Sequence, residues 1–157
     1  MIKNFNLRRP FATVLLGSSL FLMNPAHAET PIKVYKNPSC GCCTGWVEHL
    51  QKNGFSADVT ATRDRSSVHQ QMGVPRDKGA CHTAVVGGYF IEGHVPAEDI
   101  KRLLEQKPDI AGLAVPGMPV GSPGMENPKY PAMDYNVLAI DKKGKASVFN
   151  HHPGAKN

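Results

Sequence analysis

The sequence predicts an α/β fold in which helices flank a β-sheet, and a long loop and a β-hairpin complete the chain. Segments with the two-residue period of strands alternate with segments of helical period as far as residue 107. Residues 111–134 are rich in Gly, Pro and Met and contain no periodic run. Two alternating segments around Lys142-Lys143-Gly144 then predict a closing hairpin, over 135–141 and 146–150.

The first helix is predicted between two strands. Residues 32–36 alternate and predict a strand, and Asn37-Pro38-Ser39 predicts a turn in which Ser39 is the N-cap. The helix should begin at about Cys42, and it should end before Gly54, which suits a left-handed position. Its expected buried face consists of Cys43, Trp46, Val47 and Leu50.

The middle of the chain predicts a second strand, a short helix and a hairpin. Residues 55–62 form the strand, Asp64 caps the short helix, and Gly73 closes it. Residues 83–86 and 89–92 pair around Gly87-Gly88.

A further helix is expected after this hairpin. It should begin at Pro96, and Lys107 suits its last turn. Ile100, Leu103 and Leu104 supply its apolar face.

Residues 1–28 have the organisation of a bacterial secretory signal peptide. Lys3, Arg8 and Arg9 form a basic start, residues 11–23 form a short apolar run, and Ala26-His27-Ala28 is a small-x-small cleavage site. The apolar run is too short to span a bilayer. We therefore expect a mature domain over residues 29–157 that is exported to the periplasm and has no membrane span.

The charge balance does not predict nucleic-acid binding. The chain has 18 basic and 13 acidic residues, and three of the basic residues lie in residues 1–28. The mature chain therefore carries a net charge of only +2, and no basic stripe is interleaved with aromatic residues.

Four cysteines carry most of the functional information. Three occur in Cys40-Gly41-Cys42-Cys43, and the fourth is joined to a histidine in Cys81-His82. Purely structural disulfides are one interpretation for an exported protein, but a disulfide between adjacent cysteines is strained, and the Cys40–Cys43 pair leaves two cysteines over. A redox centre or a soft-metal site better explains why the cysteines are so close together in the sequence.

The order of elements matches a thioredoxin-like fold. In that fold the redox cysteines lie between the first strand and the first helix, where unpaired N–H groups and the helix dipole stabilise a thiolate. Cys40-Gly41-Cys42-Cys43 occupies this place, and Cys81-His82-Thr83 occupies the place of the cis-proline that faces the cysteines. We therefore expect the two motifs to lie together.

Thiols, imidazoles and thioethers together are the ligand set of Cu(I). The thiols are Cys40, Cys42, Cys43 and Cys81. The candidate imidazoles are His82, His94, His151 and His152, whereas His49 and His69 are expected on the surface. The long loop holds or adjoins Met118, Met125 and Met133.

Two other chemistries compete with copper. Three cysteines and a histidine can bind zinc, but C-x-C-C is tighter than a zinc knuckle, and zinc has no use for methionine. Thiol–disulfide exchange by Cys40 and Cys43 fits the CxxC spacing, although Cys42 would then compete as a third thiol.

Four motifs in order make the sequence similar to the CopG-like periplasmic copper-resistance proteins. They are Asn37-Pro38-Ser39-Cys40-Gly41-Cys42-Cys43, Cys81-His82-Thr83-Ala84-Val85, Tyr89-Phe90-Ile91-Glu92-Gly93-His94-Val95-Pro96 and Gly112-Leu113-Ala114-Val115-Pro116-Gly117-Met118-Pro119. The exported family is meant, not the DNA-binding repressor of the same name.

The resemblance implies a thioredoxin-like fold that holds a cysteine-bridged cluster of several copper ions. It also implies a role in copper detoxification, with a periplasmic efflux or redox partner and Cu(I)/Cu(II) interconversion, which would make the protein a copper oxidoreductase. The implied ligands are Cys40, Cys42, Cys43, Cys81, His82 and His94, together with Met118 and Met125. A copper chaperone without redox turnover remains an alternative.

Overall fold

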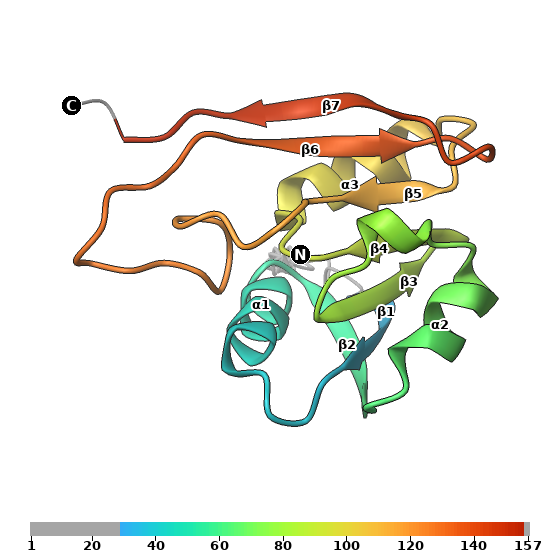
Figure 1. Ribbon diagram of the computed structural model, residues 1–157, viewed down its shortest axis with the longest axis horizontal. Coiled ribbons are helices and arrows are strands. Elements are labelled where there is room, and N and C mark those ends of the chain that lie inside the picture. The colour runs from blue at the N-terminus through green and yellow to red at the C-terminus, as the bar shows by residue number, and fades with distance from the viewer. Residues whose placement is uncertain (1–28, 156–157) are drawn as a thin grey trace, which may run out of the picture.

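The computed structural model describes residues 29–155 and contains three α-helices and seven strands in that range (Figure 1). The expected signal peptide, residues 1–28, lies outside the described residues. The strands are β1 (Thr30–Lys36), β2 (Phe55–Ala61), β3 (His82–Val86), β4 (Tyr89–Glu92), β5 (Gly112–Ala114), β6 (Tyr135–Ile140) and β7 (Ala146–His152). The helices are α1 (Gly41–Lys52), α2 (Arg65–Met72) and α3 (Ala97–Gln106), with a short 3₁₀ turn at Arg76–Lys78.

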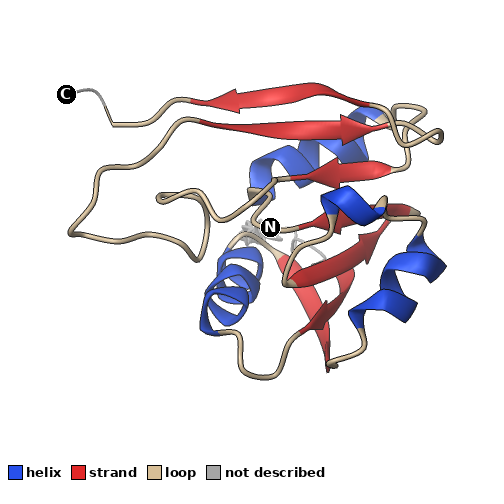
Figure 2. Ribbon diagram, viewed as in Figure 1, coloured by secondary structure: helices blue, strands red, loops and turns tan. Residues whose placement is uncertain are grey.

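The seven strands form one mixed sheet in the order β2-β1-β3-β4-β5-β6-β7. The β1–β2 and β4–β5 pairs are parallel, and the other neighbours are antiparallel. The fold is therefore mixed α/β, as predicted, and the β6–β7 hairpin closes the chain. Figure 2 shows the helices arranged around the sheet and the long loop between β5 and β6 beside α1.

Two apolar clusters cover the two faces of the sheet. The larger one packs α1 and α3 against the sheet and includes Trp46, Leu50, Ile91, Ile100 and Leu113. The smaller one lies on the opposite face, where Phe90 points because side chains alternate along β4. The apolar positions predicted for the first helix are all buried, which confirms its predicted face.

Most predicted elements are confirmed, and three details differ. Asp64 caps α2, Gly73 ends it in a left-handed conformation, and Gly87-Gly88 joins β3 to β4. The N-cap of α1, however, is Cys40 and not Ser39, and Lys107 is the left-handed C-cap of α3, not part of its last turn.

The third difference is β5, which lies in the segment expected to be a loop. Its three residues pair with β4 and β6, and Gly112 passes so close to Phe90 that an added Cβ would lie 2.2 Å from the Phe90 carbonyl oxygen. Separately, no helix in residues 29–155 is long and apolar enough to cross a membrane.

Candidate metal centre

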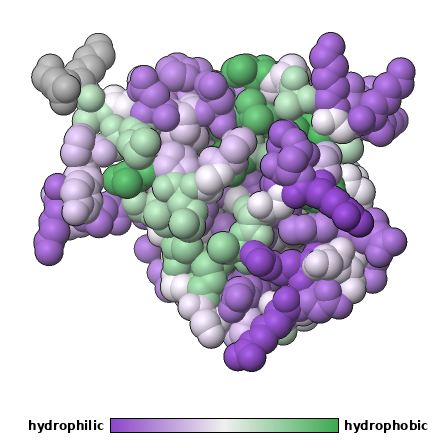
Figure 3. Space-filling model, in the orientation of Figure 1, coloured by the Kyte–Doolittle hydropathy of each residue, from purple (hydrophilic) through white to green (hydrophobic). Residues whose placement is uncertain are grey.

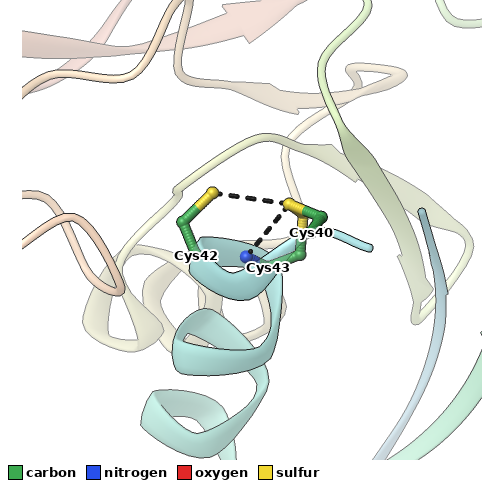
Figure 4. A group of neighbouring side chains, drawn as sticks. All are labelled: Cys40, Cys42 and Cys43. Carbon is green, nitrogen blue, oxygen red and sulfur yellow. Dashed lines mark hydrogen bonds between the residues drawn. A yellow bond between two sulfur atoms is a disulfide. The ribbon is translucent and has the colours of Figure 1, made fainter. Parts of the chain in front are cut away.

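Three cysteine sulfurs gather at the first turn of α1 (Figure 4). Cys40 and Cys43 form a disulfide with a Cα–Cα distance of 5.3 Å, and the Cys42 sulfur lies 3.4 Å from that of Cys40. The Cys43 backbone N–H donates to the Cys40 sulfur at 3.3 Å, which is the N-cap bond of the helix. Cys40 and not Ser39 is the N-cap because the Cys40 sulfur accepts a backbone N–H of the first turn. The exposed Ser39 side chain accepts none.

Cys81 lies beside this group rather than in it. Its carbonyl oxygen is 3.7 Å from the Cys43 sulfur and accepts a bond from the Asn37 N–H. Cys81 is a free, partly buried thiol at the start of β3. The two cysteine motifs are therefore neighbours, as expected.

His82 and His94 are fully buried next to each other. Their ring centroids are 4.9 Å apart, and the His82 ring also lies 4.4 Å from that of Trp46. Trp46 is fixed in turn, because its Nε1–H donates to the Val95 carbonyl at 2.8 Å. Helix α1 thus supplies both the cysteines and the wall of the histidine pocket.

Backbone carbonyls assign the tautomer of each histidine. His82 Nε2 lies 2.9 Å from the Gly93 carbonyl oxygen, and His94 Nδ1 lies 2.8 Å from that of Pro123. A carbonyl only accepts, so these nitrogens carry the protons. Each ring keeps one lone pair, on His82 Nδ1 and on His94 Nε2.

His82 Nδ1 is buried and has no hydrogen-bond partner. Burial, together with the smaller effect of the neighbouring His94 ring, lowers the pKa of His82 to about 3; burial also lowers the pKa of His94. Both rings are therefore neutral at pH 7, which is the form that binds metals. An orphaned lone pair on the residue that follows Cys81 fits a soft metal ion.

The β5–β6 loop packs directly on the start of α1. A Cβ added to Gly124 would lie 2.5 Å from the Cys42 carbonyl oxygen and 2.6 Å from the Trp46 nitrogen. Pro123, one residue earlier, holds His94, and Met125 follows at once. The loop therefore brings the backbone at Met125 to the centre, while the Met118 side chain lines a cavity together with Cys81 and His94.

Replacing Gly124 by alanine is expected to destabilise the protein by about 1–3 kcal/mol, because the new methyl group overlaps the α1 backbone. The matched control is Gly117→Ala in the same loop: its φ of +74° resembles the +81° of Gly124, but its Cβ would meet nothing within 4 Å. Denaturant unfolding measures both variants. Equal losses would mean that the loop does not dock on α1 in this way.

Sequence reasoning missed a buried polar network behind Cys81. The Glu92 carboxylate accepts bonds from the Ala80 N–H and, at 2.7 Å, from the Thr83 hydroxyl. Arg65 donates to the Ala80 carbonyl at 2.8 Å. Both peptide groups of Ala80, the residue before Cys81, are thus held in place. The alternation of side chains along β4 puts Glu92 on the same buried face as Phe90. This pattern could have predicted that the Glu92 carboxylate is buried.

The other histidines are engaged elsewhere. His49 and His69, which were expected on the surface, are each only partly exposed: His49 Nε2 accepts the Ala97 N–H at the start of α3, and His69 Nε2 lies 3.2 Å from a Glu92 oxygen. His152 contacts Asp99 at 2.7 Å, and the more exposed His151 contacts Asn136 at 2.9 Å.

The buried groups predict opposing effects of pH on stability. The pKa of His82 is lowered, so the unfolded chain binds the extra proton and stability is lost as pH falls below 6.5. Burial raises the pKa of Glu92 to about 7, so the folded chain keeps a proton between pH 4.5 and 7, and stability rises as pH falls through that window.

Glu92→Gln should therefore remove the stabilisation that Glu92 provides at low pH and leave the loss of stability that the histidines cause. We expect the variant to lose about 2 kcal/mol of unfolding free energy between pH 7 and pH 5, whereas the wild-type protein changes less. Denaturant unfolding of the metal-free protein at both pH values measures this, with the exposed His151→Gln as the control. The lowered pKa values of His49, His69 and His94 act in the same direction as that of His82, so a Glu92→Gln variant with a flat pH profile would contradict the assignment of neutral, buried histidines.

A mixed α/β domain with clustered thiols and neutral imidazoles at a helix N-terminus defines a candidate soft-metal or thiol-redox protein. Two solved structures, described as form 1 and form 2 of the copper resistance protein CopG, are 45% identical to this chain, with TM-scores of 0.75 and 0.74. Each match covers 80% of this chain and 99% of the other. The chain belongs to the CopG family of copper-resistance proteins.

Two further comparisons bear on the family. Residues 78–125, which include Cys81, His82 and His94, match a family model described as a protein of unknown function, DUF411. No curated protein matches the chain.

Proposed function

We propose that this protein binds several copper ions in the periplasm as part of bacterial copper resistance. The observation that carries the proposal is the convergence of three cysteine sulfurs within 4.8 Å at the start of α1. The similarity to copper resistance proteins over nearly their whole length supports it. Residues 1–28 would direct export, and residues 29–157 would form a thioredoxin-like domain.

The proposed copper ligands come from four parts of the fold. They are Cys40, Cys42 and Cys43 at the start of α1, Cys81 and His82 at β3, His94 before α3, and Met118 and Met125 in the long loop. Copper is the cargo, and Cu(I) is the oxidation state that thiolates and thioethers prefer. Imidazoles also accept Cu(II), so the same residues support a redox change between the two states.

The Cys40–Cys43 disulfide would gate copper binding. Two electrons and two protons convert it to two thiols, and these lose their protons when they bind metal. In the oxidised chain, the free thiols are Cys42 and Cys81. Reduced protein should therefore hold copper in a competition against a Cu(I) chelator, and oxidised protein should release much of it.

The same disulfide favours a second function, thiol–disulfide exchange. A CxxC pair at a helix N-terminus is the arrangement used for it. Metal-free protein would then reduce a model disulfide, and copper would inhibit that reaction by occupying the thiols. Failure of the reduced chain to hold copper against the chelator, together with disulfide reduction, would favour this function over copper binding. A chaperone without redox turnover would bind Cu(I) and release it to a partner, without converting Cu(I) to Cu(II).

A further inference from the structure

Two cavities meet at Met118, on the side of the centre that the long loop covers. The outer cavity, of about 440 Å³, is lined by Met118 and Met133 together with Asp134 and Tyr135. The inner cavity, of about 220 Å³, is lined by Met118, Cys81, His94 and Arg65. Met118 is thus common to an outer groove and to a pocket that reaches a thiol and an imidazole.

Met118 and Met133 are exposed although methionine is apolar. Their exposed fractions are 56% and 54%, so neither gains much packing energy where it lies. In the space-filling view, pale green surface lies over α1 and the neighbouring loop, and further green surface lies at the top of the drawn face (Figure 3). Thioethers are neutral, soft ligands that suit Cu(I) and offer little to hard cations.

The backbone holds the two arms of the loop together around these methionines. The Met133 N–H donates to the Val120 carbonyl at 2.8 Å, and a Cβ on Gly121 would lie 2.5 Å from that of Ala132. The Ala155 N–H closes the far side by donating to the Ala132 carbonyl at 2.9 Å. The groove is therefore a built part of the loop.

The charges next to the two cavities differ in sign. Asp134 lines the outer groove, whereas the Arg65 guanidinium lines the inner cavity. A cation that enters the inner cavity directly from solvent meets Arg65, and one that arrives through the groove first meets a carboxylate. The groove is the electrostatically favoured approach to Cys81 and His94.

We propose that Met118 and Met133 form a loading site for Cu(I), and that Met118 passes the ion to Cys81 and His94. The inference rests on the proposed copper-binding function and adds the route by which copper enters. The ion exchanges thioether ligands for thiolate and imidazole ligands without a change of oxidation state. Met133 would serve entry alone and would not hold copper in the loaded protein.

Loading kinetics test this role. Reduced protein receives Cu(I) from a weak chelator in a stopped-flow experiment, and chelator absorbance reports transfer. We expect Met133→Leu, which conserves side-chain volume, to load about tenfold more slowly but to bind the same number of ions. The control is Met72→Leu, since Met72 is partly buried against the second apolar cluster and lines neither cavity. Unchanged rates in Met133→Leu and Met118→Leu would overturn the proposal.

A direct binding measurement complements the kinetics. The oxidised Cys42→Ser/Cys81→Ser variant keeps the Cys40–Cys43 disulfide and has no free thiol left, so metal cannot be taken up by cysteine. With ¹³C-methyl-labelled methionine, added Ag(I), a redox-silent substitute for Cu(I), should shift the methyl resonances of Met118 and Met133 but not that of Met72. Absence of these shifts would overturn the loading site.

The two proposals fail in distinguishable ways. Wild-type protein that binds no Cu(I) would overturn the copper-binding function and this inference with it. Normal copper uptake with unchanged loading rates and unshifted methionine methyl groups would overturn the loading site alone.

Discussion

Replacing Cys42 by serine is expected to lower the number of copper ions that the reduced protein binds. The Cys42 sulfur lies 3.4 Å from that of Cys40 and is outside the disulfide, so it is the thiol best placed to bridge ions held by its neighbours. Serine keeps the size of the side chain but replaces a soft thiolate by a hard hydroxyl, which Cu(I) disfavours. Metal analysis after desalting measures the loss.

Ser39→Ala is the matched control for this change. Ser39 is exposed in the same turn, and no bond of its hydroxyl supports α1, whose N-cap is Cys40. This variant should bind as much copper as the wild-type protein. A Cys42→Ser variant that also binds normally would mean that the three sulfurs do not form one copper site.

Replacing Trp46 by alanine is expected to reduce the unfolding free energy by about 3–5 kcal/mol, the usual cost of deleting a buried aromatic side chain. The side chain is fully buried, contacts the His82 ring and donates to the Val95 carbonyl. Its loss removes one wall of the histidine pocket and admits water to it. Denaturant unfolding followed by circular dichroism measures the change, since Trp46 is the sole tryptophan of the chain.

Trp46→Phe separates packing from hydrogen bonding at this position. It keeps a ring against His82 but leaves the buried Val95 carbonyl without its donor, which costs about 1–3 kcal/mol. A smaller loss is therefore expected than for alanine. An alanine variant that loses no more than the phenylalanine variant would contradict the role of Trp46 as the wall of the pocket.

The arrangement of the cysteines was predictable because it depends on local pattern. The period of α1 and the turn before it place Cys40, Cys42 and Cys43 at one helix end, and the order of elements places Cys81 beside them. The state of the histidines was not predictable. The orphaned Nδ1 of His82 depends on Trp46, Gly93 and His94, which the sequence separates and only the packed core brings together.

The other features that the sequence did not predict are either very short or depend on contacts between distant parts of the chain. Three residues are too few for β5 to show a strand period, and it exists because β4 and β6 pair with it. Close packing of Gly124 on α1 likewise depends on a contact about eighty residues away in sequence. Glu92 was missed because a single acidic residue at a strand end resembles a solvated charge until its buried partners are known.

In the proposed function, the thiols of the CxCC motif and Cys81 hold copper together. Anaerobic titration of the reduced protein with Cu(I), with the ions counted by native mass spectrometry, tests it most directly. We predict that more than one copper ion binds to each chain and resists a competing chelator. A chain that binds no copper, or a single readily removed ion, would contradict the account.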